Sequence, residues 1–170
     1  MQDAIGCYEK AATLMETAFG DPGMLIACYT SVGDTESARR AARTTLARAE
    51  KALAQDPSNG SALSFGVGAL AALGEVDKAM EWVRRALLID PDNLNMRYNL
   101  GCALVVLGEA DAALDLLGPY LATATVGDLD HIRVDPDLDA LRHDPRFQAM
   151  IASAEARLAA RAEPESRAPG

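Results

Sequence analysis

A repeat of 34 residues constrains the fold of this chain more than any other feature of its sequence. The repeated positions lie between residues 57 and 125, and the matching pairs are Pro57 and Pro91, Leu70 and Leu104, Gly74 and Gly108, Ala79 and Ala113, and Trp82 and Leu116. A fixed period of this length is typical of stacked two-helix units, which bury their apolar faces against their neighbours. The repeat therefore predicts an all-α fold in which antiparallel helix pairs form a solenoid.

The composition agrees with close-packed helices and disfavours some partners. Hydrophobic residues make up 49% of the chain but aromatic residues only 5%, so Ala and Leu supply most of the apolar surface. The formal net charge of −9 repels phosphate backbones and anionic lipid surfaces. We expect neither nucleic acid nor a membrane as a partner.

The cysteines and the first residues indicate a compartment. Cys7, Cys28 and Cys102 lie far apart and show no C-x-x-C spacing, so we interpret them as buried apolar residues in a reducing environment. The first residues lack a basic segment followed by an apolar run. The prediction is a soluble, cytoplasmic protein.

Apolar spacing and breakers divide the chain into three regions. Residues 1–125 are expected to hold the repeats, with a half unit at 3–17 and helix pairs at about 22–56, 59–90 and 93–122. Gly20, Asp21, Pro22 and Gly23 are expected to end the first helix. Residues 126–162 are predicted to form acidic turns or single-turn helices at 127–144 and then a capping helix from Pro145, whereas residues 163–170 are predicted to be disordered.

Three segments of this pattern resemble the tetratricopeptide repeat family. The residues that carry the resemblance are Leu25, Tyr29, Gly33, Ala38, Ala52 and Pro57; Leu63, Leu70, Gly74, Ala79, Val83, Ala86 and Pro91; and Leu100, Gly101, Leu104, Gly108, Ala113 and Leu117. The resemblance implies a right-handed superhelix that binds proteins or peptides, with no enzymatic activity and no cofactor.

A second resemblance concerns the segment from Asp135 to Gln148 and the lengthened helix before Asp56. Both resemble the C-terminal repeat segment of bacterial regulatory proteins with an upstream adenylate or guanylate cyclase, protein kinase or DNA-binding domain. This implies the C-terminal scaffold or regulatory part of a larger signalling protein. Ala4 and Tyr8 match the second helix of a unit, so we expect the array to begin upstream of Met1.

The tetratricopeptide resemblance also implies a binding groove lined by the first helix of each pair. The matching positions are Ala27, Thr30, Ser61, Ser64, Phe65, Gly68, Asn95, Tyr98, Asn99 and Cys102. Such a groove would contact a peptide backbone through Asn95 and Asn99 and apolar side chains through Phe65 and Tyr98. Alternatively, Phe65 and Tyr98 only pack between helices. Trp82, on a second helix, is expected to be partly buried.

Two further functions remain open. The main alternative is a homodimer, in which the apolar face formed by Ile5, Tyr8 and Met15, or the long helix at about 35–55, pairs with its copy. The other is a metal-dependent sensor or enzyme that uses the loop at 127–144, with Asp128, Asp130, His131, Asp135, Asp137, Asp139, His143 and Asp144. An EF-hand is excluded because Ala140 and Arg146 replace the required Gly and Glu. Asp before Pro is more simply explained as a turn or cap, and the sequence contains no nucleophile with a spaced base, no Gly-rich phosphate loop and no H-E-x-x-H helix. We therefore expect no metal site, no cofactor and no catalytic residues.

Overall fold

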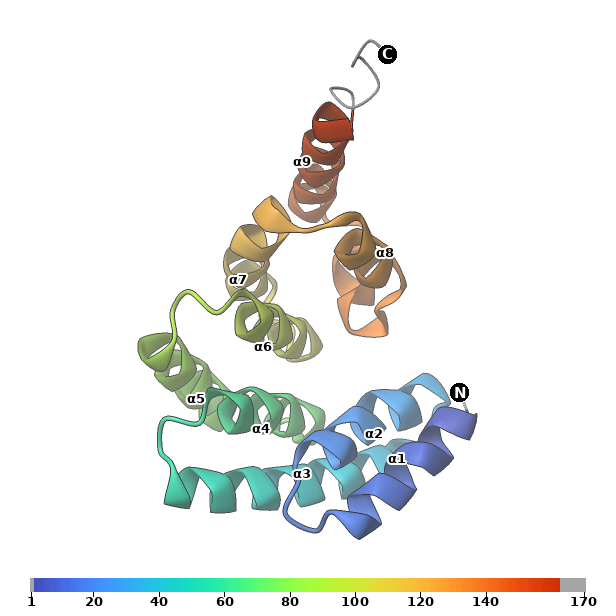
Figure 1. Cartoon of the computed structure of the whole chain (residues 1–170), viewed down its shortest axis with the longest axis vertical. Helices are drawn as coiled ribbons and strands as arrows, with labels where there is room; N and C mark the ends of the chain where they lie inside the picture. Colours follow the sequence, from blue (N-terminus) through green and yellow to red (C-terminus); the bar gives the residue numbers. More distant parts are fainter. Residues whose placement is uncertain (1, 163–170) are drawn as a thin grey trace, which may run out of the picture.

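Helices follow one another along the chain and stack into an elongated array (Figure 1). The computed structural model describes residues 2–162, and no strand occurs within them. The elements are α1 (Gln2–Leu14), α2 (Gly20–Ser31), α3 (Thr35–Gln55), α4 (Gly60–Leu73), α5 (Val76–Ile89), α6 (Leu94–Val106), α7 (Ala110–Thr123), α8 (Val126–Val134), the 3-10 helix η1 (Pro136–Leu141) and α9 (Pro145–Ala162). The predicted all-α stack of helix pairs is confirmed for these residues.

The ends of the repeated helices have the signals expected of them. Gly74 and Gly108 have φ values of 77° and 82°, a left-handed conformation that glycine adopts without steric cost, and each follows the first helix of a pair. Asn59 and Asn93 precede α4 and α6, and each side-chain oxygen accepts a hydrogen bond from a backbone N–H in the first turn, at 2.9 Å. Equivalent residues thus begin and end equivalent helices.

The repeated positions form the core. Leu70 and Leu104 are 0% and 1% exposed, and Ala79 and Ala113 are completely buried. One continuous hydrophobic cluster extends from α3 to α9, whereas a smaller cluster around Ile5 joins α1, α2 and α3. The period of 34 residues therefore reflects burial at the same place in successive helix pairs.

The first turn of the chain differs from the sequence prediction. Gly20 to Gly23 do not end α1, which already ends at Leu14; they form the first turn of α2. Pro22 is tolerated there because the first residues of a helix have no intrahelical acceptor for their N–H groups. Gly23 allows close packing, since a Cβ atom at this position would lie 2.5 Å from Cδ1 of Phe65.

The acidic segment is more regular than predicted. Residues 126–134 form a helix of nine residues, α8, instead of single turns. Its start is fixed by a capping box, in which the Thr125 hydroxyl accepts from the Asp128 N–H and the Asp128 carboxylate accepts from the Thr125 N–H. The 3-10 helix η1 then lies against α6 and reaches α2.

The structure also bears on the predictions for the cysteines and for Trp82. The interpretation of all three cysteines as buried is wrong, because Cys7 is exposed while Cys102 is buried; none forms a disulfide. Trp82 is only 7% exposed, so it is more fully buried than expected. The predicted disordered tail lies outside the described residues. Between residues 2 and 162, no helix is both long and apolar enough to cross a membrane.

Candidate functional site

A hollow of about 150 Å³ lies between the first turns of α4 and α6. It is lined by Gly60, Ser61, Ser64, Phe65, Asn93, Asn95, Met96 and Asn99. Five of these, Ser61, Ser64, Phe65, Asn95 and Asn99, are among the residues that the sequence predicted for a peptide groove. The structure brings these five together.

Helical spacing explains why these side chains share one surface. Residues three or four apart on a helix are neighbours, which places Ser61, Ser64 and Phe65 on one face of α4. Asn95 and Asn99 are likewise one turn apart on α6, and both are exposed. The hollow therefore presents side-chain amides beside an aromatic ring.

Ser64 is the most unusual residue of the hollow. Its side chain is buried, at 6% exposure, and its hydroxyl has no hydrogen-bond partner within the part of the chain that the structure describes. A serine within a helix often donates to the carbonyl four residues earlier, but this one does not. Because a buried hydroxyl without a partner destabilises the folded state, Ser64 is suited to pair with a group that enters the hollow.

Phe65 forms the side of the hollow that faces α2. Its ring lies 5.7 Å from the ring of Phe19, at an interplanar angle of 54°. It also packs against Gly23 in the first turn of α2. Phe65 thus packs between helices, which was one of the two interpretations of this residue. It also lines the hollow.

Tyr98 and Cys102 do not line the hollow. They are 7% and 6% exposed, because η1 covers this part of α6. The Tyr98 hydroxyl donates to Oδ2 of Asp135 at 2.5 Å, and Sγ of Cys102 lies 3.9 Å from the same oxygen. Burial, together with the negative charge of Asp135, raises the pKa of both Tyr98 and Cys102.

The remaining predicted groove residues lie outside the hollow. Ala27 is half-buried on α2, and the exposed Thr30 donates its hydroxyl to the Ile26 carbonyl at 2.8 Å. Gly68 lies on α4 beside open space, because a Cβ atom there would meet no atom within 4 Å. The structure therefore concentrates the predicted groove on the first turns of α4 and α6.

Most carboxylates of the acidic segment serve helix ends and ion pairs. Asp130 pairs with Arg133 at 2.8 Å and Asp139 with Arg142 at 2.6 Å. Arg146 pairs with Asp144 and lowers the pKa of that carboxyl to about 2. Across residues 2–162 the structure brings together no group of three or more His, Cys, Asp or Glu side chains able to hold a metal ion.

Asp137 is the exception in this segment. Burial, with the neighbouring charges of Asp135 and Asp139, raises its pKa to about 6. Its backbone N–H donates to Asp135 at 3.0 Å, but no basic side chain of the described residues pairs with its carboxylate.

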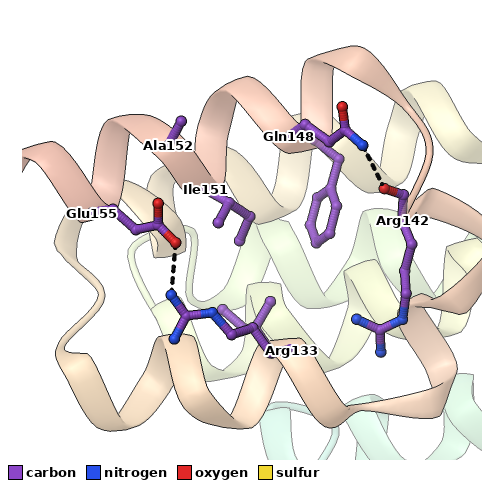
Figure 2. A pocket seen from close by; sticks show the side chains of 8 residues that line it. Arg133, Arg142, Gln148, Ile151, Ala152 and Glu155 are labelled. Atoms are coloured by element: carbon purple, nitrogen blue, oxygen red, sulfur yellow. Dashed lines mark hydrogen bonds and ion pairs between the residues drawn. The ribbon is translucent and has the colours of Figure 1, made fainter.

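A second, larger pocket lies between α8 and α9 (Figure 2), and no sequence pattern predicted it. It measures about 290 Å³, and its apolar part is formed by Ile132, Phe147 and Ile151. Its charged rim is already paired, since Arg133 bonds to Glu155 at 2.6 Å (Figure 2). Gln148 donates to the carbonyl of Arg142 at 3.0 Å.

The three residues of the predicted dimer face have different environments. Ile5 is 6% exposed and packs in the small cluster with Leu25 and Ala41. Tyr8 is half-buried against the same cluster, and Met15 follows the end of α1 with 59% exposure. The structure therefore leaves only part of this face accessible.

Comparison with known families identifies the central part of the chain. Residues 33–95, from the turn before α3 to the first turn of α6, match the family model described as tetratricopeptide repeat. This segment contains tetratricopeptide repeats. The predicted resemblance is confirmed here, and the tetratricopeptide segment includes six of the eight residues that line the hollow. No curated protein matches the chain.

Tetratricopeptide repeats generally mediate interactions between proteins. Each repeat contacts mainly its neighbours, which leaves an extended surface along the first helices of the pairs. In this chain α4 and α6 are two such helices, and the hollow lies between them. The surface expected from the family and the hollow between α4 and α6 therefore coincide.

Proposed function

We propose that this chain is a protein-interaction module that binds a short segment of another protein in the hollow between α4 and α6. The observation that carries the proposal is the buried hydroxyl of Ser64, which has no hydrogen-bond partner among residues 2–162, at a surface that also exposes Asn95 and Asn99. Each asparagine amide offers both donors and an acceptor, which match the N–H and C=O groups of an extended peptide.

The size of the hollow favours a peptide over a small molecule. Pockets for small molecules usually measure roughly 300–1,000 Å³ and enclose most of the ligand. At about 150 Å³ and open to the surface, this hollow suits one side chain of a peptide whose backbone continues outside it. Phe65 and Met96 supply apolar contact, and none of the described residues that line the hollow is charged.

The proposal is tested with a phage-displayed library of random peptides selected on the immobilised chain. Selected peptides are then titrated against the unmodified chain and against the double variant Asn95→Ala, Asn99→Ala. We expect at least about tenfold weaker binding to the double variant, because two backbone contacts are lost. Glu81→Ala, at an exposed position of α5, is the matched control and should bind normally.

A peptide that binds the double variant and the unmodified chain equally would place the interaction elsewhere. Circular dichroism of the double variant keeps the test interpretable, since both asparagines are exposed and their truncation should leave the helices intact.

We further propose that the module is a regulatory part of a larger bacterial signalling protein located in the cytoplasm. The support is the resemblance of Asp135 to Gln148 to the C-terminal segments of such regulators. Mass spectrometry of the native polypeptide tests this, because the proposal requires a longer chain with an effector domain.

A homodimer remains the alternative, although the burial of Ile5 limits the face predicted for it. Light scattering that gives a dimer mass would support that alternative.

A further inference from the structure

The hollow between α4 and α6 adjoins a row of carboxylates. Asn95, Asn99 and Cys102 lie on one face of α6 at helical spacing, so this face leads from the hollow to η1. The Cys102 thiol lies 3.9 Å from Oδ2 of Asp135, and the charge of Asp137 also raises the pKa of this thiol. The carboxylate of Asp135, just before η1, therefore lies beside this face about one helical turn along α6 from Asn99, and the N–H of Asp137 donates to it at 3.0 Å.

Asp137 differs from its neighbours because its charge is not compensated. Asp139 is paired with Arg142, and Asp135 accepts from Tyr98 and lies 3.6 Å from Nε2 of His131. Asp137 is half-buried, and no Lys, Arg or His among residues 2–162 pairs with its carboxylate. A partly buried carboxylate in this situation gains from a cation supplied by a partner.

The helices that border the groove, α2, α4 and α6, have almost no basic side chain that could supply such a cation. The sequences of α2 and α4 include no lysine or arginine. The one basic residue of α6 is Arg97, whose Nε donates to the carbonyl of Pro91 at 2.6 Å, before the helix begins. The groove therefore combines an uncharged hollow with an adjoining negative charge.

We propose that the segment bound in the hollow carries a lysine or arginine side chain, whose cation pairs with Asp137 while the peptide backbone contacts Asn95 and Asn99. This inference rests on the proposed function. The buried hydroxyl of Ser64, which has no partner among the described residues, is the independent sign that a ligand enters here. A lysine or arginine side chain is long enough to extend past one helical turn from the hollow to η1.

The probes for the test are three fluorescein-labelled hexapeptide mixtures. Their fixed third position is Lys, Gln or Glu, and the other five positions are randomised over uncharged residues. Fluorescence anisotropy against the unmodified chain should show at least about tenfold tighter binding of the Lys mixture than of the Gln mixture. The Glu mixture should bind most weakly.

The variant Asp137→Asn keeps the shape of the side chain and removes its charge. It should reduce the preference for Lys over Gln to less than about twofold, while binding of the Gln mixture stays unchanged. Asp115→Asn makes the same change in net charge at an exposed position of α7 and should retain the preference. Loss of the preference in both variants would mean that the overall negative charge attracts the peptide, which overturns the inference.

The remaining outcomes separate the inference from the proposed function. Equal binding of the Lys and Gln mixtures, lost in the double variant Asn95→Ala, Asn99→Ala, would overturn the inference and leave the groove as the binding site. Absence of binding by all three mixtures would overturn both.

Discussion

The hydroxyl of Tyr98 donates a hydrogen bond to the carboxylate of Asp135, 37 residues later in the chain, with an O–O distance of 2.5 Å. This contact joins η1 to the face of α6 that would otherwise continue the groove. It buries Tyr98 and Cys102 and leaves the hollow at Asn95 and Asn99 open. The C-terminal segment of the chain thus determines how much of the repeat surface a partner can reach.

Removal of this hydrogen bond should loosen η1. Tyr98→Phe leaves the ring in place but takes a donor from a carboxylate, so we expect the free energy of unfolding to fall by about 1–3 kcal/mol. Amide hydrogen exchange in residues 136–141 should accelerate, because the segment opens more often. The control is Tyr8→Phe, at the half-buried Tyr8 of α1. Unchanged exchange in Tyr98→Phe would show that apolar packing alone holds η1.

Two glycines of α4 provide a matched test of packing between the helices of one pair. A Cβ atom at Gly66 would lie 2.2 Å from Cζ3 of the buried Trp82, whereas a Cβ atom at Gly68 would meet nothing within 4 Å. Gly66→Ala should destabilise the protein by about 1–3 kcal/mol through overpacking, net of the gain in helix propensity.

Gly68→Ala should instead raise stability by up to about 1 kcal/mol, because it gains helix propensity without a clash. Urea denaturation of both variants measures the difference. Equal stabilities would contradict the close contact between α4 and Trp82.

The sequence predicted the repeats well because the same kinds of residue are buried at the same place in successive pairs. Leu70 and Leu104 are both buried, so the need for apolar residues in the core recurs in the sequence every 34 residues. Helix α8 was missed because its signal is a cap, Thr125 with Asp128, and not an apolar period. The start of α2 was missed because Pro22 was interpreted as a breaker, although proline also fits the first turn of a helix.

The candidate site was predictable only in part for a related reason. The resemblance to tetratricopeptide repeats placed Ser64, Asn95 and Asn99 on one groove, and helical spacing explains why the residues of each helix share a face. The burial of Tyr98 depends on a contact with Asp135, and no local pattern connects residues so distant in sequence. The pocket between α8 and α9 likewise depends on how the last helix packs, which the repeat does not specify.

Arg48 should hold the end of α1 in place. Its guanidinium on α3 donates to the carbonyl oxygens of Ala12, Met15 and Ala18, at 3.0, 3.1 and 2.7 Å. The last carbonyls of a helix have no intrahelical donors, so these bonds satisfy the end of α1 and the turn after it. Arg48→Met should lower stability by about 1–3 kcal/mol and increase cleavage by protease after residue 14.

The control is Arg43→Met, at an exposed position of the same helix, which should have little effect. Similar effects of both variants would rule out a specific role for Arg48.

Asp137 should make stability depend on pH in a direction opposite to most carboxylates. Its pKa is raised in the folded protein to about 6, from an ordinary value of 3.8, by burial and by the charges of Asp135 and Asp139. At pH 7 the carboxylate is charged in both states, and its burial disfavours the folded one. As the pH falls through 6 the folded state takes up a proton first, so this destabilisation disappears between about pH 6 and 4.

The variant Asp137→Asn isolates this contribution. It is neutral at all pH values, so it should be more stable than the unmodified chain at pH 7, and the difference should shrink at pH 5. Urea denaturation of both proteins at the two pH values measures it, with Asp115→Asn to correct for the change in net charge. A difference that stays constant from pH 7 to 5 would mean that Asp137 does not titrate in this range. If a bound lysine or arginine pairs with Asp137, the cation lowers its pKa, so peptide binding should weaken between pH 7 and 5 in the unmodified chain and not in Asp137→Asn.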